Sequence, residues 1–336
     1  MSGLLGEIKY LIAWGDGKGV TVYGFLIAVA ILAGGVFGYL LAKKRNYPAD
    51  IAIDVVLWCV PLAIVGARLY YVIFTAICDG QKWGFLEMFA VWDGGLAVYG
   101  GILFAILGCF LLSIFYKKRK KPDEAAINSK IESLEIKIKG TQDEKIKKKL
   151  TREKAGLADG LKPKPSFFQM ADLGAPFLIL GQAIGRIGCY YSECCYGNPV
   201  TNPNWQWLPF AVPIASDGGN WHLATFFYES AWCLIGLAVM LYFSLSKKKR
   251  WQFDGFVFAF YLMFYGLGRF ILEFLRVESS ETLWLIPGAV TASMAVAVIM
   301  FLWGAYIMAR AFFFRKAGVI SPSKENRPTK KENEDK

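Results

Sequence analysis

The stretch Gly181–Gly197, GQAIGRIGCYYSECCYG, places a single arginine, Arg186, at the end of an apolar segment. Polar, aromatic and cysteine residues follow it directly. Inserting an arginine at the centre of a membrane helix costs roughly 2.5–3.5 kcal/mol of free energy even on the scales that give the lowest values. Such an arginine therefore usually faces the protein interior and has a function. We therefore expect Arg186 to line a site inside a bundle of helices.

The composition excludes an ordinary soluble protein. Of 336 residues, 55% are hydrophobic, and the mean hydropathy is +0.37. The apolar residues come in blocks near the length of about 20 residues that spans a bilayer. Residues 1–19 lack a basic start followed by an apolar run and a cleavage site, so we expect no removable signal peptide. The sequence predicts an all-α polytopic membrane protein.

Seven segments have the length and apolarity of membrane spans. They are Thr21–Ala42, Ile51–Ile77, Gly95–Phe115, Phe167–Tyr190, His222–Leu245, Gly255–Leu275 and Leu283–Met308. Thirty-one of the 38 basic residues fall in four segments on one side: 43–45, 117–164, 247–250, and from Arg310 onward. Because Lys and Arg accumulate in cytoplasmic loops, the N-terminus is predicted outside and the C-terminus in the cytoplasm.

This topology divides the chain into four parts. They are helices one to three in 1–116, a cytoplasmic charged insertion in 117–165, helices four to seven in 166–309 with an outer cap at 192–221, and a basic, disordered tail in 310–336. The apolar spacing within 117–164 predicts a helical hairpin. It is either a solvated charged element near anionic lipid head groups or a coiled coil that binds a partner.

Four arginines are the basic residues left inside or at the outer end of spans: Arg68, Arg186, Arg269 and Arg276. At about 1.5 Å per residue, the first three lie about 21–29 Å above the cytoplasmic ends of their helices. Four further polar residues fall near that level: Tyr23, Tyr99, His222 and Glu229. An excess of arginine at one depth predicts a bound anion, and the planar guanidinium fork suits phosphate.

In span six, YGLGRFILEFLRVE puts Tyr265, Arg269, Glu273 and Arg276 on one predicted helical face. These residues form part of an anion-binding site, or Arg269 and Glu273 form an ion pair that only holds the helices together. His222 is the only histidine, and alone such a residue is more often an interface residue than a base.

Two further motifs have structural alternatives as well. GGLAVYGG, Gly94–Gly101, either packs helices through small residues or lets a lipid approach Tyr99. The cluster of Cys189, Cys194 and Cys195 consists of free thiols, forms a disulfide or binds a soft metal; because the sequence has no matching His/Cys set, we expect no metal site.

Five motifs in order resemble those of the prolipoprotein diacylglyceryl transferase family. They are GARLYYVIF, GGLAVYGG, GRIGCYYSECCYG, HLATFFYES and YGLGRFILEFLR, and together they cover nearly the whole membrane portion. The resemblance implies seven spans with the N-terminus outside. It implies transfer of the diacylglyceryl group of phosphatidylglycerol to the lipobox cysteine of a lipoprotein precursor, with release of glycerol 1-phosphate. It also implies that no metal or other cofactor takes part.

By resemblance, the family's two essential arginines fall on Arg186 and Arg269. Its span-one tyrosine falls on Tyr23, its span-six tyrosine on Tyr265 and its span-six glutamate on Glu273. This sequence departs from the family at four positions: Cys189 replaces an asparagine, Cys194 a glutamate with Glu193 one position earlier, Tyr99 a histidine, and Met294 a glutamine. These departures leave the phosphate-binding arginines intact and the proton acceptor open.

The expected site has two groups of residues. The expected catalytic residues are Arg186, Arg269, Tyr99, Glu193 and His222. The expected substrate-binding residues are Tyr23, Arg68, Gly100, Gly101, Gly197, Tyr265, Glu273 and Arg276. The expected partners are phosphatidylglycerol, a prolipoprotein lipobox peptide and membrane lipids, without nucleic acid, in the bacterial plasma (inner) membrane. The alternatives are a non-catalytic lipid-binding scaffold or an anion transporter.

Overall fold

The computed structural model describes residues 10–13, 19–45, 47–48, 50–78, 82–90, 98–118, 123–160, 165–191, 195–246, 253–276, 284–286 and 290–316. The side chains of Tyr23 and Tyr99 lie outside this described part, as does all of Glu193. The chain divides into two compact units, one made of Met1–Phe37 and Ala171–Lys336, the other of Gly38–Met170.

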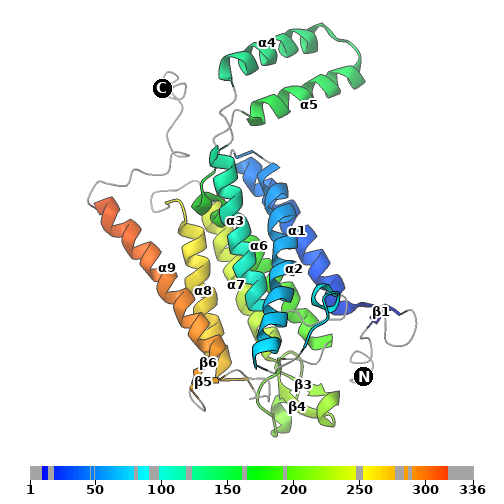
Figure 1. The fold of residues 1–336 in the computed structure, drawn as a ribbon, viewed down its shortest axis with the longest axis vertical. Coiled ribbons are helices and arrows are strands. Elements are labelled where there is room, and N and C mark those ends of the chain that lie inside the picture. Colours follow the sequence, from blue (N-terminus) through cyan, green and yellow to red (C-terminus); the bar gives the residue numbers. More distant parts are fainter. Residues whose placement is uncertain are drawn as a thin grey trace. The chain divides into compact units, whose positions relative to one another are not determined.

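Helices dominate both units (Figure 1). The helices are α1 Val22–Lys44, α2 Asp50–Cys78, α3 Val98–Lys118, α4 Glu124–Gly140, α5 Glu144–Gly160, α6 Phe167–Tyr191, α7 Thr225–Leu245, α8 Phe256–Glu273 and α9 Ala292–Lys316. Short 3₁₀ turns occupy η1 Glu87–Phe89, η3 Pro203–Trp205 and η4 Ala215–Asp217. Three antiparallel strand pairs complete the described elements: β1 Tyr10–Ala13 with β2 Gly19–Thr21, β3 Ala211–Ile214 with β4 Asn220–Leu223, and β5 Trp284–Ile286 with β6 Val290–Thr291.

The prediction of an all-α polytopic membrane protein is confirmed. Among the described residues, six helices are long and apolar enough to cross a membrane, and Gly100–Tyr116 of α3 is a shorter apolar helix. Large apolar side chains on these helices face outward: Leu57 is 64% exposed and Ile299 62% exposed. Such broad apolar surfaces are unusual on soluble proteins and fit a hydrocarbon environment.

Two predicted spans begin too early. α7 starts at Thr225 instead of His222, because Asn220–Leu223 pairs with β3. α9 starts at Ala292 instead of Leu283, because β5 and β6 form a hairpin before it. Span six was also extended too far, since α8 ends at Glu273 and Arg276 lies in the turn after it.

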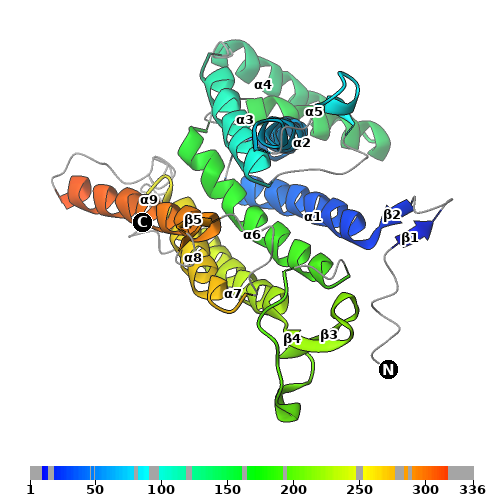
Figure 2. The same cartoon turned by 60° about the horizontal axis from the view of Figure 1, so that its bottom comes forward.

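In the first unit, α8 packs between α7 and α9 (Figure 2). Small residues permit the α8–α9 contact: a Cβ on Gly266 would lie 2.7 Å from the Ala297 carbonyl oxygen, and one on Gly304 equally close to that of Ala259. Close backbone approach through small residues is typical of membrane helix pairs. This packing fixes α8, which carries Arg269 and Glu273 of the site.

Asp172 on α6 caps the first turn of α8. Its side chain is 4% exposed, and its two oxygens accept hydrogen bonds from the backbone N–H groups of Gly255 at 2.7 Å and Phe258 at 2.8 Å. Gly255 has φ +98°, a conformation that favours glycine. The carboxylate therefore supplies, from a neighbouring helix, the acceptor that an N-cap residue normally provides.

Replacing Asp172 with alanine is expected to destabilise the docking of α8. Two buried N–H groups would lose their acceptor, each at a cost of about 1–3 kcal/mol. Thermal unfolding of the detergent-solubilised protein measures the loss. Asp172→Asn, which keeps one acceptor oxygen, should fall between the alanine variant and the natural protein. An alanine variant as stable as the natural protein would contradict this capping role.

In the second unit, α2 and α3 pack through glycines. A Cβ on Gly100 would lie 2.2 Å from the Gly66 carbonyl oxygen and 2.4 Å from Tyr70 Cβ, so only glycine fits there without a shift. A Cβ on Gly101 would lie 3.4 Å from the Ala63 carbonyl oxygen. The charged insertion of this unit folds as α4 and α5, which pack against each other.

Candidate active site

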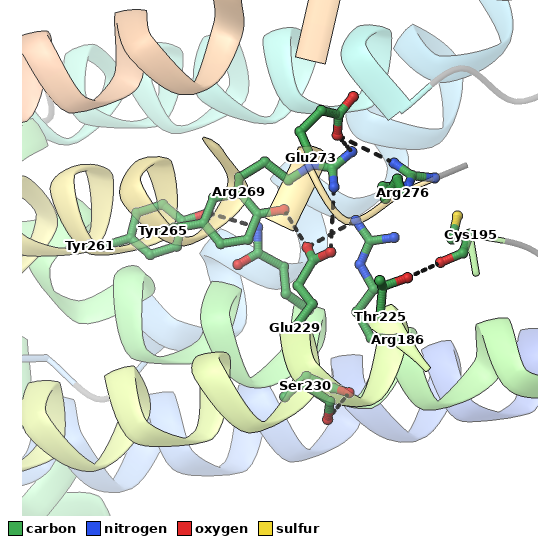
Figure 3. Close-up of polar contacts among 12 residues, drawn as sticks. Arg186, Cys195, Thr225, Glu229, Ser230, Tyr261, Tyr265, Arg269, Glu273 and Arg276 are labelled. Atoms are coloured by element: carbon green, nitrogen blue, oxygen red, sulfur yellow. Dashed lines mark hydrogen bonds and ion pairs between the residues drawn. The ribbon is translucent and has the colours of Figure 1, made fainter. Parts of the chain in front are cut away.

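Glu229 is the centre of the charged site in the first unit (Figure 3). This carboxylate on α7 is 4% exposed. Its Oε1 lies 3.0 Å from Nη2 of Arg186 on α6 and accepts a hydrogen bond of 3.1 Å from the Tyr265 hydroxyl on α8. Its Oε2 lies 3.7 Å from Nη1 of Arg269, also on α8. Three helices therefore meet at one carboxylate.

A second carboxylate, Glu273, lies at the last turn of α8. Its Oε2 is 2.9 Å from Arg269 Nη2 and 3.7 Å from Arg276 Nη1. Its Oε1 accepts a hydrogen bond of 2.8 Å from the hydroxyl of Thr291, the residue before α9. Arg269 therefore lies between Glu229 and Glu273, with one carboxylate on each side (Figure 3).

The arginine cluster, which we define as Arg186, Arg269 and Arg276 with Glu229 and Glu273, carries three positive and two negative charges. Among these five side chains one positive charge is in excess. The Nη1 atom of Arg269 is buried and has no aligned hydrogen-bond partner in the described part. Buried donors are normally satisfied, so this nitrogen, which only a 3.7 Å contact joins to Glu229 Oε2, can take an additional acceptor. An anionic group such as a phosphate would supply both the charge and the acceptor.

Two stacked tyrosines extend the polar site along α8. The rings of Tyr261 and Tyr265 lie 5.9 Å apart, nearly parallel. Gln182, one helical turn before Arg186 on α6, donates from Nε2 to the Tyr261 hydroxyl at 3.0 Å. Its Oε1 is buried and lacks a partner among the described residues. The site therefore continues past the ion pairs as a row of hydroxyl and amide groups.

The cap that follows α6 closes onto the end of α8 at Gly197. Gly197 forms an isolated bridge with Arg276, and its N–H donates to the Leu223 carbonyl at 2.8 Å. A Cβ at this position would lie 2.5 Å from the Leu275 carbonyl oxygen. The Thr225 hydroxyl donates to the Cys195 carbonyl at 2.6 Å, which ties the start of α7 to the same segment.

His222 is enclosed in the cap, on β4. It is 5% exposed, with Nδ1 2.9 Å from the Gly197 carbonyl oxygen and Nε2 2.8 Å from Asp217 Oδ2. Both neighbours can only accept, so both contacts are hydrogen bonds when both ring nitrogens carry protons. This geometry favours a structural role that joins the β3–β4 hairpin to Gly197.

The pairing of Asp217 with His222 predicts a pH dependence. Hydrogen bonds from His222 and then from Asn220 lower the pKa of Asp217 below its usual value. A lowered folded-state pKa contributes stability above the unfolded value of about 3.9, and this is lost as pH falls through the folded value. The side chain is 49% exposed, so the effect is modest.

We expect Asp217→Asn to be less stable than the natural protein near neutral pH. The difference should shrink as pH falls from about 6 to about 3. Thermal unfolding of both proteins across that range measures it. A stability difference that stays constant with pH would mean that the Asp217 charge does not contribute to the cap.

Arg68, Gly100 and Gly101 belong to the second unit. Arg68 is 4% exposed and donates from Nε to the Met88 carbonyl at 3.2 Å and from Nη2 to that of Glu87 at 2.5 Å. Its guanidinium carbon lies 5.2 Å from the centre of the Trp83 ring. These contacts hold the loop after α2, and Gly100 allows the close approach of α2 and α3. The first observation favours a structural role for Arg68, and the second favours the helix-packing alternative for Gly100.

Sequence reasoning did not assign a role to four residues of the site. Glu229 is the only charged residue of α7, and that isolation in an apolar helix was the available signal. Thr291, Tyr261 and Gln182 carry no comparable signal, because a hydroxyl or an amide in a membrane helix is common. Only the structure shows that Thr291 contacts Glu273, that Gln182 contacts Tyr261, and that Tyr261 stacks on Tyr265.

Thr291 is expected to position Glu273. Its hydroxyl donates to Glu273 Oε1 and also accepts the Met294 N–H at 3.1 Å, which caps α9. Thr291→Val should lower the thermal stability by about 0.5–2 kcal/mol, the usual cost of losing a cap. It should also lower turnover, because Glu273 would lose its orientation. Thr291→Ser, which keeps the hydroxyl, should restore both, and equal activity of the valine and serine variants would contradict this role.

Comparison with known proteins gives one consistent result. A family model described as prolipoprotein diacylglyceryl transferase matches residues 11–125 and 157–310. The unmatched residues 126–156 hold most of α4 and α5.

Curated relatives agree with the family model. A protein of Lactobacillus acidophilus is 31% identical over 291 residues, covering 84% of this chain and 82% of its own length. One of Finegoldia magna is 31% identical over 288 residues, covering 86% and 90% respectively. One of Halalkalibacterium halodurans is 29% identical over 262 residues, covering 76% and 72%. All three are named phosphatidylglycerol–prolipoprotein diacylglyceryl transferase, and this chain belongs to the prolipoprotein diacylglyceryl transferase family.

Proposed function

We propose that this protein transfers the diacylglyceryl group of phosphatidylglycerol to the cysteine thiol of a lipoprotein precursor. The family membership supports the reaction. The observation that carries the site assignment is the buried Arg269 Nη1, which lacks an aligned acceptor and lies in a cluster with one excess positive charge. The lipid phosphate is the anion that this cluster would accept.

In this proposal Arg186 and Arg269 hold the phosphate. Both guanidiniums already contact Glu229, which keeps two positive charges close together before the lipid arrives. Apo sites often hold such contacts long or misaligned until substrate binds, and the separation of 3.7 Å at Arg269 fits that behaviour. Arg276, with 26% of its side chain exposed, would assist from the outer edge.

The reaction breaks one C–O bond and forms one C–S bond. The thiolate of the precursor attacks the glycerol carbon that bears the phosphate oxygen, since the thiolate is the nucleophilic form of cysteine. The bonding electrons leave with the phosphate oxygen, and glycerol 1-phosphate departs. Donors that are aimed at charge developing on this leaving group lower the barrier, which is the role we assign to the two arginines.

The thiol proton needs an acceptor. Tyr99 and Glu193 stay predictions for this role, because the side chain of Tyr99 and all of Glu193 lie outside the described residues. We do not assign it to His222, because both of its ring nitrogens face acceptors. Tyr265 would bind substrate beside Glu229, and Tyr23 stays a predicted substrate-binding residue whose side chain is likewise not described.

We further infer that the arginine cluster faces the outer side of a bacterial plasma membrane. The basic loops at 43–45 and 247–250 support a cytoplasmic location for the opposite helix ends. The N-terminus would then lie outside and the C-terminus in the cytoplasm. The divisions 1–116, 117–165 and 166–309 stay predictions, but the predicted disordered tail cannot begin at 310, because α9 continues to Lys316.

The direct test uses purified protein, labelled phosphatidylglycerol and a lipobox peptide. The mass of the peptide should rise by that of one diacylglyceryl group, and glycerol 1-phosphate should appear in equal amount. A peptide with serine in place of the lipobox cysteine is the matched control and should stay unmodified. Lipid binding without a mass change would favour the scaffold alternative, and uptake of an anion into sealed vesicles would favour the transporter.

A further inference from the structure

The α4–α5 hairpin has an apolar inner seam and a basic outer face. On α4, Leu134 is buried and Ile127, Ile131 and Ile138 are half-buried. On α5, Leu150 and Leu157 are half-buried, and Lys154 forms an ion pair with Glu135 of α4. These six apolar residues are therefore covered where the two helices pack, whereas Ile136 and Ile146 are exposed.

The opposite face of α5 is basic. At about 100° per residue, Lys145, Lys148, Lys149 and Arg152 fall within an arc of about 100° that is opposite Leu150 and Leu157. All four side chains are exposed. We call these four residues the basic face. α4 differs, since its three lysines are balanced by three glutamates.

Short connections join the hairpin to two apolar helices. α3 ends at Lys118 and α4 begins at Glu124, while α5 ends at Gly160 and α6 begins at Phe167. Five and six connecting residues reach at most about 18–21 Å when fully extended. α6 is a candidate membrane span, and Gly100–Tyr116 of α3 is a shorter apolar helix. The basic run KKRKK at 117–121 adds positive charge at the same connection.

We propose that the basic face binds the anionic head groups of the adjacent membrane surface. Charge complementarity selects anionic lipid, and the short connections limit the distance that the face must cover. Each Lys or Arg near such a surface adds roughly a fivefold preference. The proposal is independent of the transferase reaction, because residues 126–156 lie outside the family match.

Lysine labelling in nanodiscs tests the contact on the full chain. Discs of phosphatidylcholine alone are compared with discs that also contain phosphatidylserine, which is anionic and differs from the proposed substrate. A water-soluble amine reagent is applied, and mass spectrometry gives the labelling rate of each lysine. We expect Lys145, Lys148 and Lys149 to react at least about fivefold more slowly in the anionic discs. The protection should be present near 0.01 M salt and absent near 1 M, because the Debye length falls from about 30 Å to about 3 Å.

The three lysines of α4, Lys130, Lys137 and Lys139, are the internal control and should change less than about twofold, because nearby glutamates cancel their charge. Equal protection on both helices would overturn the assignment to the basic face. Equal labelling of the α5 lysines in the two kinds of disc would overturn lipid binding altogether. Protection that is present in both disc types and resists salt would point to a protein partner or a second copy instead.

Two matched variants then distinguish an effect of the basic face from an effect of the total charge of the hairpin. One variant carries Lys145, Lys148 and Lys149 changed to glutamine, and the other carries Lys130, Lys137 and Lys139 changed to glutamine. Each removes three exposed charges and leaves the apolar seam unchanged. Amide exchange of α5 in anionic discs should be several-fold faster in the first variant only, at unchanged transferase activity. The same acceleration in both variants would contradict the proposal.

Discussion

Arg186→Lys and Arg269→Lys are each expected to lower the rate of thioether formation by at least about 10²–10³, which corresponds to about 2.7–4 kcal/mol of transition-state stabilisation. Lysine keeps the positive charge but loses the planar fork that donates two parallel hydrogen bonds. Both arginines contact Glu229, and the Arg269 nitrogen that does so, Nη1, is buried without an aligned hydrogen bond and can turn to the phosphate. Shape as well as charge should therefore matter at both positions.

The initial rate at saturating lipid is the measurement, with thermal stability followed in parallel. Because lysine retains the ion pair with Glu229, both variants should remain folded. Arg276→Lys is the matched control: its nitrogen lies 3.7 Å from Glu273 and its side chain is partly exposed, so its loss should be much smaller. Near-normal turnover in Arg186→Lys or Arg269→Lys would return that residue to a purely structural role.

The sequence was sufficient to predict which elements cross the membrane. Helix length and apolarity are local properties. Six of the seven predicted spans therefore match helices that are long and apolar enough to cross a membrane. The remaining one, the third along the chain, matches the shorter apolar helix α3. The predicted starts of two helices were wrong because the residues there form strand pairs. Trp284–Ile286 is apolar enough to extend a helix, yet it pairs with β6, and His222 pairs within the cap.

The sequence also showed that Arg186 and Arg269 lie in apolar helices. The partner of each charge was not predictable, because it depends on helix rotation and on contacts between distant segments. Arg68 illustrates this: it lies in an apolar helix like the others, but its donors reach the carbonyl groups of Glu87 and Met88. A loop carbonyl leaves no trace in the sequence, since every residue carries one.

Glu229→Gln is expected to have the largest effect on stability. Glutamine has nearly the same shape and can still accept the Tyr265 hydrogen bond, but it removes the negative charge shared by Arg186 and Arg269. Removing one partner of a buried ion pair typically costs about 3–5 kcal/mol, because the remaining charge is left uncompensated. Turnover should also fall by about 10², since repulsion would move the two guanidiniums out of position.

Glu229→Gln leaves excess positive charge in the arginine cluster. The response of this variant to anionic lipid tests the phosphate site more directly than its lowered stability does. If the cluster binds a phosphate between Arg186 and Arg269, the anionic lipid replaces part of the missing charge. Phosphatidylglycerol should then raise the thermal stability of Glu229→Gln more than that of the natural protein, whereas phosphatidylcholine, which has no net charge, should act alike on both. Glu135→Gln removes a carboxylate from the surface ion pair of the α4–α5 hairpin and should change neither stability nor turnover appreciably. An unstable Glu229→Gln protein that phosphatidylglycerol does not rescue would mean that Glu229 only fastens the helices and that the phosphate binds elsewhere.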